Sequence, residues 1–316
     1  MTIIRKLCIL SSVVACCSIS QIDSTGIKLI EQRKYKEAQS FFEIAVEKNK
    51  RDAEARYYLA VSLSRQGNFD EAEDEIDEAI DLNENVGKYH HARGEILGQQ
   101  AMNANVLSQA FLAPKIKNAF LRASELDPSN VTARVALFNY YIMAPGIMGG
   151  SEEKALAEAD AVTKLDPFRG YLLRANYYNR KKDSVNAESE IKKAIEAAPE
   201  RGSGYKQLGY FYMNQKRYKE AYGQMKKYID FEPKNPDAHD SYADVLRAEG
   251  KFDLAIEKYL LALSIDKNFS ASIFSLADCY EKKSMHQKAK ETYRWFLAVE
   301  PDGRRAETAK KKINEL

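Results

Sequence analysis

The chain has 316 residues, of which 45% are hydrophobic and 30% charged, a composition that excludes a disordered protein. Its length suits either two average domains or one long repeat array. The 48 basic and 46 acidic side chains nearly balance, and without Arg5 and Lys6 they are equal in number. The chain therefore lacks the basic surplus that nucleic-acid binding requires, and we expect no nucleic-acid partner.

The first twenty residues differ from the rest of the chain. Arg5 and Lys6 precede an apolar run over residues 7–15, and small residues near Ser20 suit cleavage. This order predicts a signal peptide over residues 1–20. The apolar run is too short to remain as a membrane-spanning helix. We therefore expect an exported protein, periplasmic or associated with the outer membrane of a bacterium.

Two alternatives for this segment stay open. Residues 13–16, VVAC, resemble a bacterial lipobox, in which case Cys16 would carry a lipid at the new N-terminus and provide the one link to a membrane. The segment could instead be a buried first helix of a cytoplasmic protein. Beyond it Cys279 is the one cysteine, so the mature chain can build no disulfide framework, and we expect a small buried residue there.

A period of 34 residues runs through the remainder of the chain. It appears in KYKEA, NFDEA, RYKEA and KFDLA at residues 34–38, 68–72, 217–221 and 251–255. Each has an aromatic residue three positions before an alanine, a bulky apolar residue follows four positions after that alanine, and a proline often closes the unit. A self-similar period of this length is typical of stacked helix pairs.

This pattern resembles the tetratricopeptide repeat, whose consensus is W-x2-L-G-x2-Y, then A-x3-F, then P. The resemblance implies an all-α, right-handed superhelical solenoid of about eight helix pairs over residues 21–316, with a capping helix near 303–315. The chain is also similar to exported bacterial members of this family, which carry APGI-x-GG at the place of residues 144–150.

Two repeats are longer than the period. About ten extra residues near 98–113 lengthen the third repeat, and we expect Pro114 to begin its second helix. Extra residues near 144–151 lengthen the fourth repeat, and their proline and glycines predict a turn between helices rather than a phosphate-binding loop. We expect Ile147 and Met148 to pack against the insertion of the third repeat. The alternative is that both remain exposed as a contact point.

The first helix of each repeat should line the concave face of the array. Its outward positions give the candidate protein-binding residues Tyr57, Asn139, Asn176, Lys206, Tyr210, Met213, Asp240, Asp244, Phe274 and Asp278. Amides and aromatic rings in the middle of this set suit the backbone and side chains of an extended peptide. The aspartates at its C-terminal end favour a basic segment. Each of these residues could also be a solvated side chain without a partner.

The sequence contains neither a nucleophile elbow nor a P-loop, and it predicts no metal or cofactor site. His90 and His91 are adjacent and point in different directions on a helix, so they cannot readily bind one metal. A non-catalytic scaffold or assembly factor of the cell envelope, which binds a protein segment, is therefore the favoured function. An enzyme or small-ligand carrier built around the two insertions is the alternative, and a cytoplasmic adaptor is a weaker one. The oligomeric state stays open.

Overall fold

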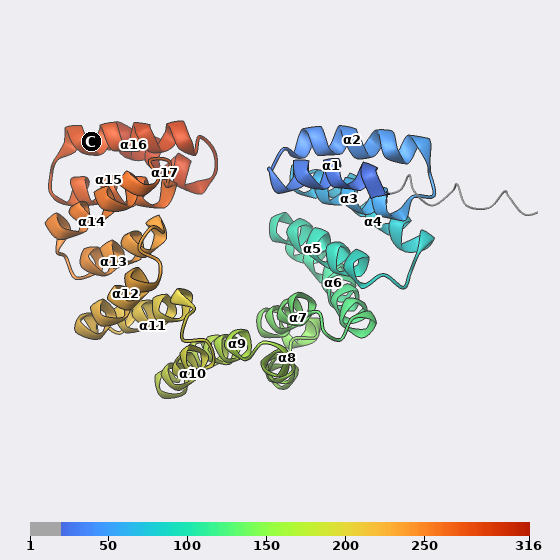
Figure 1. The fold of residues 1–316 in the computed structure, drawn as a ribbon, viewed down its shortest axis with the longest axis horizontal. Helices are drawn as coiled ribbons and strands as arrows, with labels where there is room; N and C mark the ends of the chain where they lie inside the picture. The colour runs from blue at the N-terminus through green and yellow to red at the C-terminus, as the bar shows by residue number, and fades with distance from the viewer. Residues whose placement is uncertain (1–19) are drawn as a thin grey trace, which may run out of the picture. The chain divides into compact units, whose positions relative to one another are not determined.

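The computed structural model describes residues 20–316, and over this range the chain forms 17 α-helices and one short 3-10 helix, with no strand (Figure 1). The predicted signal peptide and Cys16 lie outside the described residues, apart from Ser20. Contacts divide the chain into two compact units, which meet in sequence between Leu165 and Asp166.

Unit 1 contains four helix pairs. Its elements are α1 (Ser20–Glu31), α2 (Tyr35–Lys48), α3 (Ala53–Ser64), α4 (Phe69–Leu82), α5 (Gly87–Asn103), α6 (Val106–Leu126), α7 (Val131–Met143), the 3-10 helix η1 (Gly146–Met148) and α8 (Glu152–Leu165). The two helices of each pair pack on one another, and each pair also packs on the next.

Unit 2 contains four further pairs and a last helix. Its elements are α9 (Pro167–Arg180), α10 (Ser184–Ala197), α11 (Gly202–Asn214), α12 (Tyr218–Phe231), α13 (Pro236–Ala248), α14 (Phe252–Ile265), α15 (Ser270–Lys282), α16 (His286–Val299) and α17 (Arg304–Glu315). Helix α17 covers α16 with the buried Ala306 and Ala309 and exposes its lysines Lys310 and Lys311. The prediction of an all-α fold of eight helix pairs with a capping helix is confirmed.

The repeated alanine lies where the two helices of a pair meet. Ala38, Ala72 and Ala221 are fully buried, and so are the bulky residues four positions later, such as Phe42 and Ile76. Each such large side chain contributes roughly 1.5–3 kcal/mol by leaving water. The period of 34 residues therefore reproduces the same small-against-large contact in pair after pair.

The insertion of the third repeat lengthens both of its helices instead of forming a loop. Helix α6 begins at Val106, where the Asn105 side chain accepts a hydrogen bond from the Ser108 amide at 3.0 Å. The prediction that Pro114 begins this helix is wrong, because Pro114 lies inside it. The alanine, leucine and glutamine residues before the proline favour a helix, and Ala113 beside it is buried. These two contributions outweigh the loss of the one hydrogen bond that proline cannot donate.

Two glycines test how close the helices of a pair must approach. A Cβ atom on Gly94 would lie 2.6 Å from the ring of the buried Phe120, whereas one on Gly209 would lie 2.8 Å from the methyl end of Met225. An aromatic ring cannot yield, but a methionine chain can turn away. Alanine also gains up to about 1 kcal/mol over glycine within a helix.

We therefore expect Gly94→Ala to destabilise the chain by about 1–3 kcal/mol and Gly209→Ala to be neutral or stabilising. Urea unfolding followed by far-UV circular dichroism measures both variants under the same conditions. Equal shifts of the two midpoints would contradict the rigid contact between Gly94 and Phe120.

Candidate functional site

An apolar groove of about 600 Å³ lies within unit 1. Three successive first helices form its walls, with Val61 on α3, Ile96 on α5 and Ala136 on α7. The second helix α6 contributes Ile116 and Phe120 to its floor. The groove therefore crosses several repeats, as a site for an extended or helical segment does.

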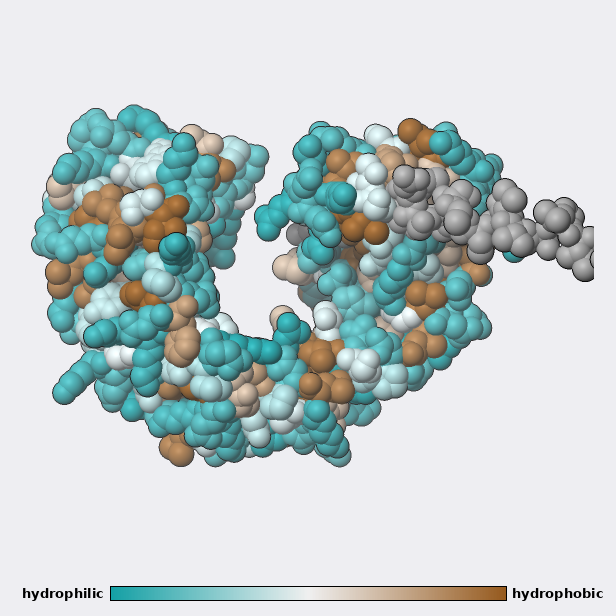
Figure 2. Space-filling view, viewed as in Figure 1, coloured by the Kyte–Doolittle hydropathy of each residue, from teal (hydrophilic) through white to brown (hydrophobic). Residues whose placement is uncertain are grey.

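The two insertions raise the walls of this groove. Met102 at the end of α5 and Met143 at the end of α7 both line the groove. The two residues are 76% and 73% exposed. Hydrophobic side chains, brown in Figure 2, reach the surface over α6 and α7 in this view. Methionine adapts its shape to irregular partners, so two of them at the rim suit an apolar ligand surface.

The turn after α7 is held by its own backbone. The Gly150 amide donates to the Pro145 carbonyl at 3.1 Å, and the Ser151 amide donates to the Tyr141 carbonyl at 3.0 Å. Gly149 has a φ of 89°, and a Cβ on Gly150 would collide with the Ala144 carbonyl oxygen. These glycines are therefore required by a tight turn, and phosphate binding is not needed to explain them.

One tyrosine fixes the turn beside the groove. The Tyr140 hydroxyl donates a hydrogen bond to the Met148 carbonyl, and burial raises the pKa of Tyr140, which keeps the hydroxyl protonated as a donor. Met148 lines the groove, and η1 contacts α6. Ile147 is 96% exposed. The expectation that both residues pack against the insertion of the third repeat is therefore wrong for Ile147 and stays a prediction for Met148.

A few polar side chains lie along the groove. Arg65, Glu95, Gln99 and Asn139 all line it and are exposed. Asn139 lines the groove, and its amide can donate to and accept from a peptide backbone. Its role in peptide binding stays a prediction. The groove combines apolar walls with few polar groups, which is the usual make-up of a binding site.

The described residues contain no group of three or more His, Cys, Asp or Glu side chains that could hold a metal ion. Over the same part of the chain, no helix has the length and apolar character needed to cross a membrane. The buried Cys279 has a pKa raised to about 12 by burial, so its thiol stays protonated. The groove therefore offers apolar walls with a few amide and charged side chains.

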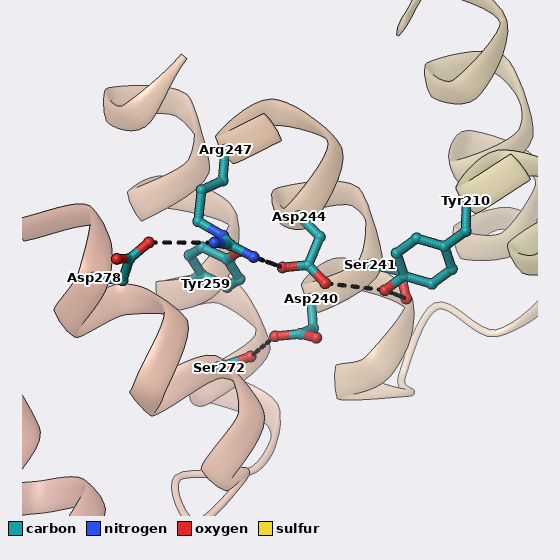
Figure 3. A network of polar contacts seen from close by, with 8 residues as sticks. All are labelled: Tyr210, Asp240, Ser241, Asp244, Arg247, Tyr259, Ser272 and Asp278. Carbon is teal, nitrogen blue, oxygen red and sulfur yellow. Dashed lines mark hydrogen bonds and ion pairs between the residues drawn. The ribbon is translucent and has the colours of Figure 1, made fainter. Parts of the chain in front are cut away.

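The candidate residues of unit 2 form a network of polar contacts (Figure 3). The Tyr210 hydroxyl donates to Asp244 Oδ2 at 3.0 Å, and the Tyr259 hydroxyl donates to Asp244 Oδ1 at 2.6 Å. Arg247 pairs with Asp244 at 3.3 Å and with Asp278 at 3.2 Å. The aspartates at this end are therefore paired within the chain, and the predicted attraction for a basic segment is largely neutralised.

Asp240 does not face solvent as the sequence predicts. It is 5% exposed and accepts a hydrogen bond from Ser272 Oγ at 2.6 Å, since the next repeat covers it. Burial, and next the charge of Asp244, raises the pKa of Asp240 to about 7. Asp240 is therefore part of the interior contact between α13 and α15.

The other candidate residues lie on separate parts of the two units. Tyr57 packs against Tyr58 and Tyr89, and Phe274 packs against Tyr293 and Phe296. Lys206 forms an ion pair with Asp237 at 2.7 Å. Met213 packs against the core of unit 2, and Asn176 is exposed. Of the ten, Asn139 lines the groove of unit 1. The sequence prediction missed Met102, which lies in the insertion of the third repeat, and Met143, which directly precedes that of the fourth.

The family model of the tetratricopeptide repeat matches residues 29–96. A chain of the APC/C hetero-tetramer Cut9-Hcn1 is 14% identical to this chain, with a TM-score of 0.48. The match covers 94% of this chain and 55% of that chain, so this chain spans about half the length of that protein. YrrB, a protein of this repeat type with an unusual peptide-binding site, is 22% identical with a TM-score of 0.39, covering 62% of this chain and 99% of that one. None of the curated proteins matches this chain in sequence.

Asp240 predicts an unusual dependence of stability on pH. Its pKa is about 7 in the folded chain and about 3.9 in an unfolded one, so folding favours the protonated carboxyl between these values. The contribution of this carboxyl to the free energy of unfolding is fully present below about pH 4, and it is lost as the pH rises to 7. Asp240→Asn should therefore match the original chain near pH 4 and exceed its stability above pH 7, by on the order of 2–4 kcal/mol.

The difference in urea midpoint between the two proteins, measured from pH 4 to 8, isolates this group because all other titrations cancel. Trp295 in α16 is the one tryptophan and reports on the unfolding of unit 2. A difference that does not change with pH would show that Asp240 titrates normally.

Proposed function

We propose that this chain, which matches the tetratricopeptide repeat model over residues 29–96 and forms helix pairs over the described residues, is a non-catalytic scaffold that binds a segment of another protein in the groove of unit 1. The observation that carries this proposal is the continuity of the groove over α3, α5 and α7. A site that crosses three successive first helices presents a long apolar surface to a partner. An extended or helical protein segment can follow such a surface from one repeat to the next.

The chemistry of the lining supports a protein segment as the ligand. Ile96, Ala136 and Ile116 offer apolar contacts to side chains of the segment. Asn139 and Gln99 lie on neighbouring first helices and provide amides that can pair with its backbone. Binding of this kind depends on shape and apolar burial, and it requires no catalytic group.

A small-ligand carrier is the second candidate. The volume of about 600 Å³ falls among those of small-molecule sites, and both insertions contribute walls through Met102 and Met148. Native mass spectrometry of the purified protein separates the candidates. A bound small molecule of fixed mass, lost on Ala136→Glu, would favour the carrier over the scaffold.

We place this scaffold in the bacterial cell envelope. The support is the sequence order of Arg5, Lys6 and the apolar residues 7–15, which is that of an export signal. Helix α1 begins at Ser20, so cleavage beside this residue leaves the first helix pair nearly whole. Lipidation at Cys16 is the alternative form of the same proposal, and a cytoplasmic location is the weaker one.

A photo-crosslinking residue placed in the groove tests the scaffold. We expect p-benzoylphenylalanine at Met143, on the groove rim, to give discrete adducts with another protein in intact cells. The same residue at Val185, which is 81% exposed in unit 2, serves as the control. Asn139→Ala should lower the yield of the Met143 adducts several-fold, because it removes a hydrogen bond to the partner that contributes about 1 kcal/mol to the free energy of binding. Identical adducts from both positions would remove the groove as the binding site.

The mature N-terminus tests the location. Export predicts that Edman sequencing or intact mass of the protein from its native cells begins next to Ser20, or at a lipid-modified Cys16. Cys16→Ser distinguishes the two, because it blocks lipid attachment and leaves cleavage near Ser20 unaffected. A mature chain that begins at Met1 or Thr2 would contradict export.

A further inference from the structure

A second hollow lies along a different face of α6 from the groove. It has a volume of about 690 Å³ and opens between the turn at Gly67, the first turns of α4, and the N-terminal half of α6. Helix α6 turns Gln109 and Ala113 toward the groove, whereas it turns Ser108 and Phe111 toward this hollow. We call the hollow the notch. It exists because the insertion carries α6 past the turn of the preceding repeat.

One wall of the notch is apolar and exposed. Phe111, which lines the notch, is 78% exposed. Leu107 lies outside the lining, one turn earlier on α6 beside Phe111, and is 76% exposed. Leu112 lines the notch beside them. Large apolar side chains grouped in this way mark a contact surface rather than scattered surface residues.

The other wall of the notch is acidic. Helix α4 has the sequence FDEAEDEIDEAIDL, which carries acidic side chains and no basic one. Asp70, Glu71 and Glu73 line the notch, and Asp74 follows one turn later. The positive end of the helix dipole stabilises the ionised form of the acidic side chains in the first turn.

Little positive charge offsets this wall. Lys115 pairs with Glu73 at 3.3 Å, and the Gln100 amide, which is neutral, donates to Asp70 at 3.2 Å. Among residues 20–316, no basic side chain pairs with Glu71 or Asp74. The notch is therefore apolar on one side and net negative on the other.

We propose that the notch is a second docking site, separate from the groove, and that it binds a basic amphipathic segment of another protein. The apolar side chains of such a segment would cover Leu107 and Phe111. Its lysines or arginines would meet Asp70, Glu71 and Asp74, which supplies the charge complementarity. An anionic membrane surface would be repelled by the same carboxylates, so the charge favours a basic protein segment over lipid.

The test uses the full chain and a short fluorescein-labelled helical peptide of leucine and lysine, compared with a peptide in which every lysine is glutamate. Fluorescence anisotropy should show saturable binding of the lysine peptide and little binding of the glutamate peptide. Phe111→Ser should weaken binding roughly 10-fold or more, by the loss of one large apolar contact. Glu71→Lys should weaken it as well, and the effect should shrink at high salt.

Matched controls keep the result specific to the notch. Val185→Ser changes an apolar residue that is 81% exposed in unit 2, and Glu78→Lys reverses a charge on α4 outside the notch. Ala136→Glu blocks the groove and leaves the notch intact, so failure of the groove and failure of the notch are told apart. All three variants should bind the lysine peptide as the original chain does.

Three results would overturn the proposal. The first is equal peptide affinity in Phe111→Ser, Glu71→Lys and the controls. The second is a dimer in sedimentation that Phe111→Ser converts to a monomer, since a second copy of this chain would then occupy the notch. The third is Phe111-dependent binding to phosphatidylglycerol vesicles, which would assign the apolar wall to a membrane.

Discussion

The close approach of two helices at a small residue is the contact on which the rest of the structure depends. Alanines such as Ala72 and Ala221 are fully buried in the second helix, and first-helix glycines such as Gly209 lie against the bulky residue four positions after the alanine, here Met225. Where that first-helix residue is Gly94, the ring of Phe120 fills the space that a side chain would take. Because pairs closed in this way bury their facing side chains, their outer faces remain free to stack on the next pair and to carry other functions.

The two insertions use this freedom without disturbing the stack. They fall between the two helices of a pair, at the edge of the array, and not between one pair and the next. In the third repeat the added residues extend α5 and α6, whereas in the fourth they form the turn fixed by Gly150 and Tyr140. The groove and the notch both arise from these additions, so unit 1 differs from a plain array at this one place.

Local and periodic features of the sequence predicted much of the fold. The spacing of the alanines defined the helix pairs, because each alanine makes the same contact. The start of α6 was not predictable from Pro114, since burial of neighbouring residues outweighed the preference of proline for a first turn. Secondary-structure preferences are local, whereas burial depends on which helix lies opposite.

The candidate site was less predictable for a similar reason. Asn139 occupies a position that the repeat itself directs toward the groove, so its place followed from the period. The fate of Asp240 and Asp278 depended on partners in other helices, namely Ser272 and Arg247. Contacts between repeats join residues about one period apart. The outward positions of a single helix do not reveal which residue of the next repeat will cover or pair with them. The arginine three residues after Asp244 was the one signal of neutralisation present in the sequence.

Pro114 has a further consequence for α6. Proline has no amide hydrogen, so the hydrogen bond that would run to the Ala110 carbonyl is missing from the helix. The ladder of hydrogen bonds is thereby weakened between the part of α6 that forms the core, with Phe120 and Ala123, and the part that lies beyond it. Opening of residues 106–113 therefore costs less free energy than opening of the whole pair. A ligand that contacts this half stabilises it directly, and the order of the segment is thus thermodynamically linked to occupancy.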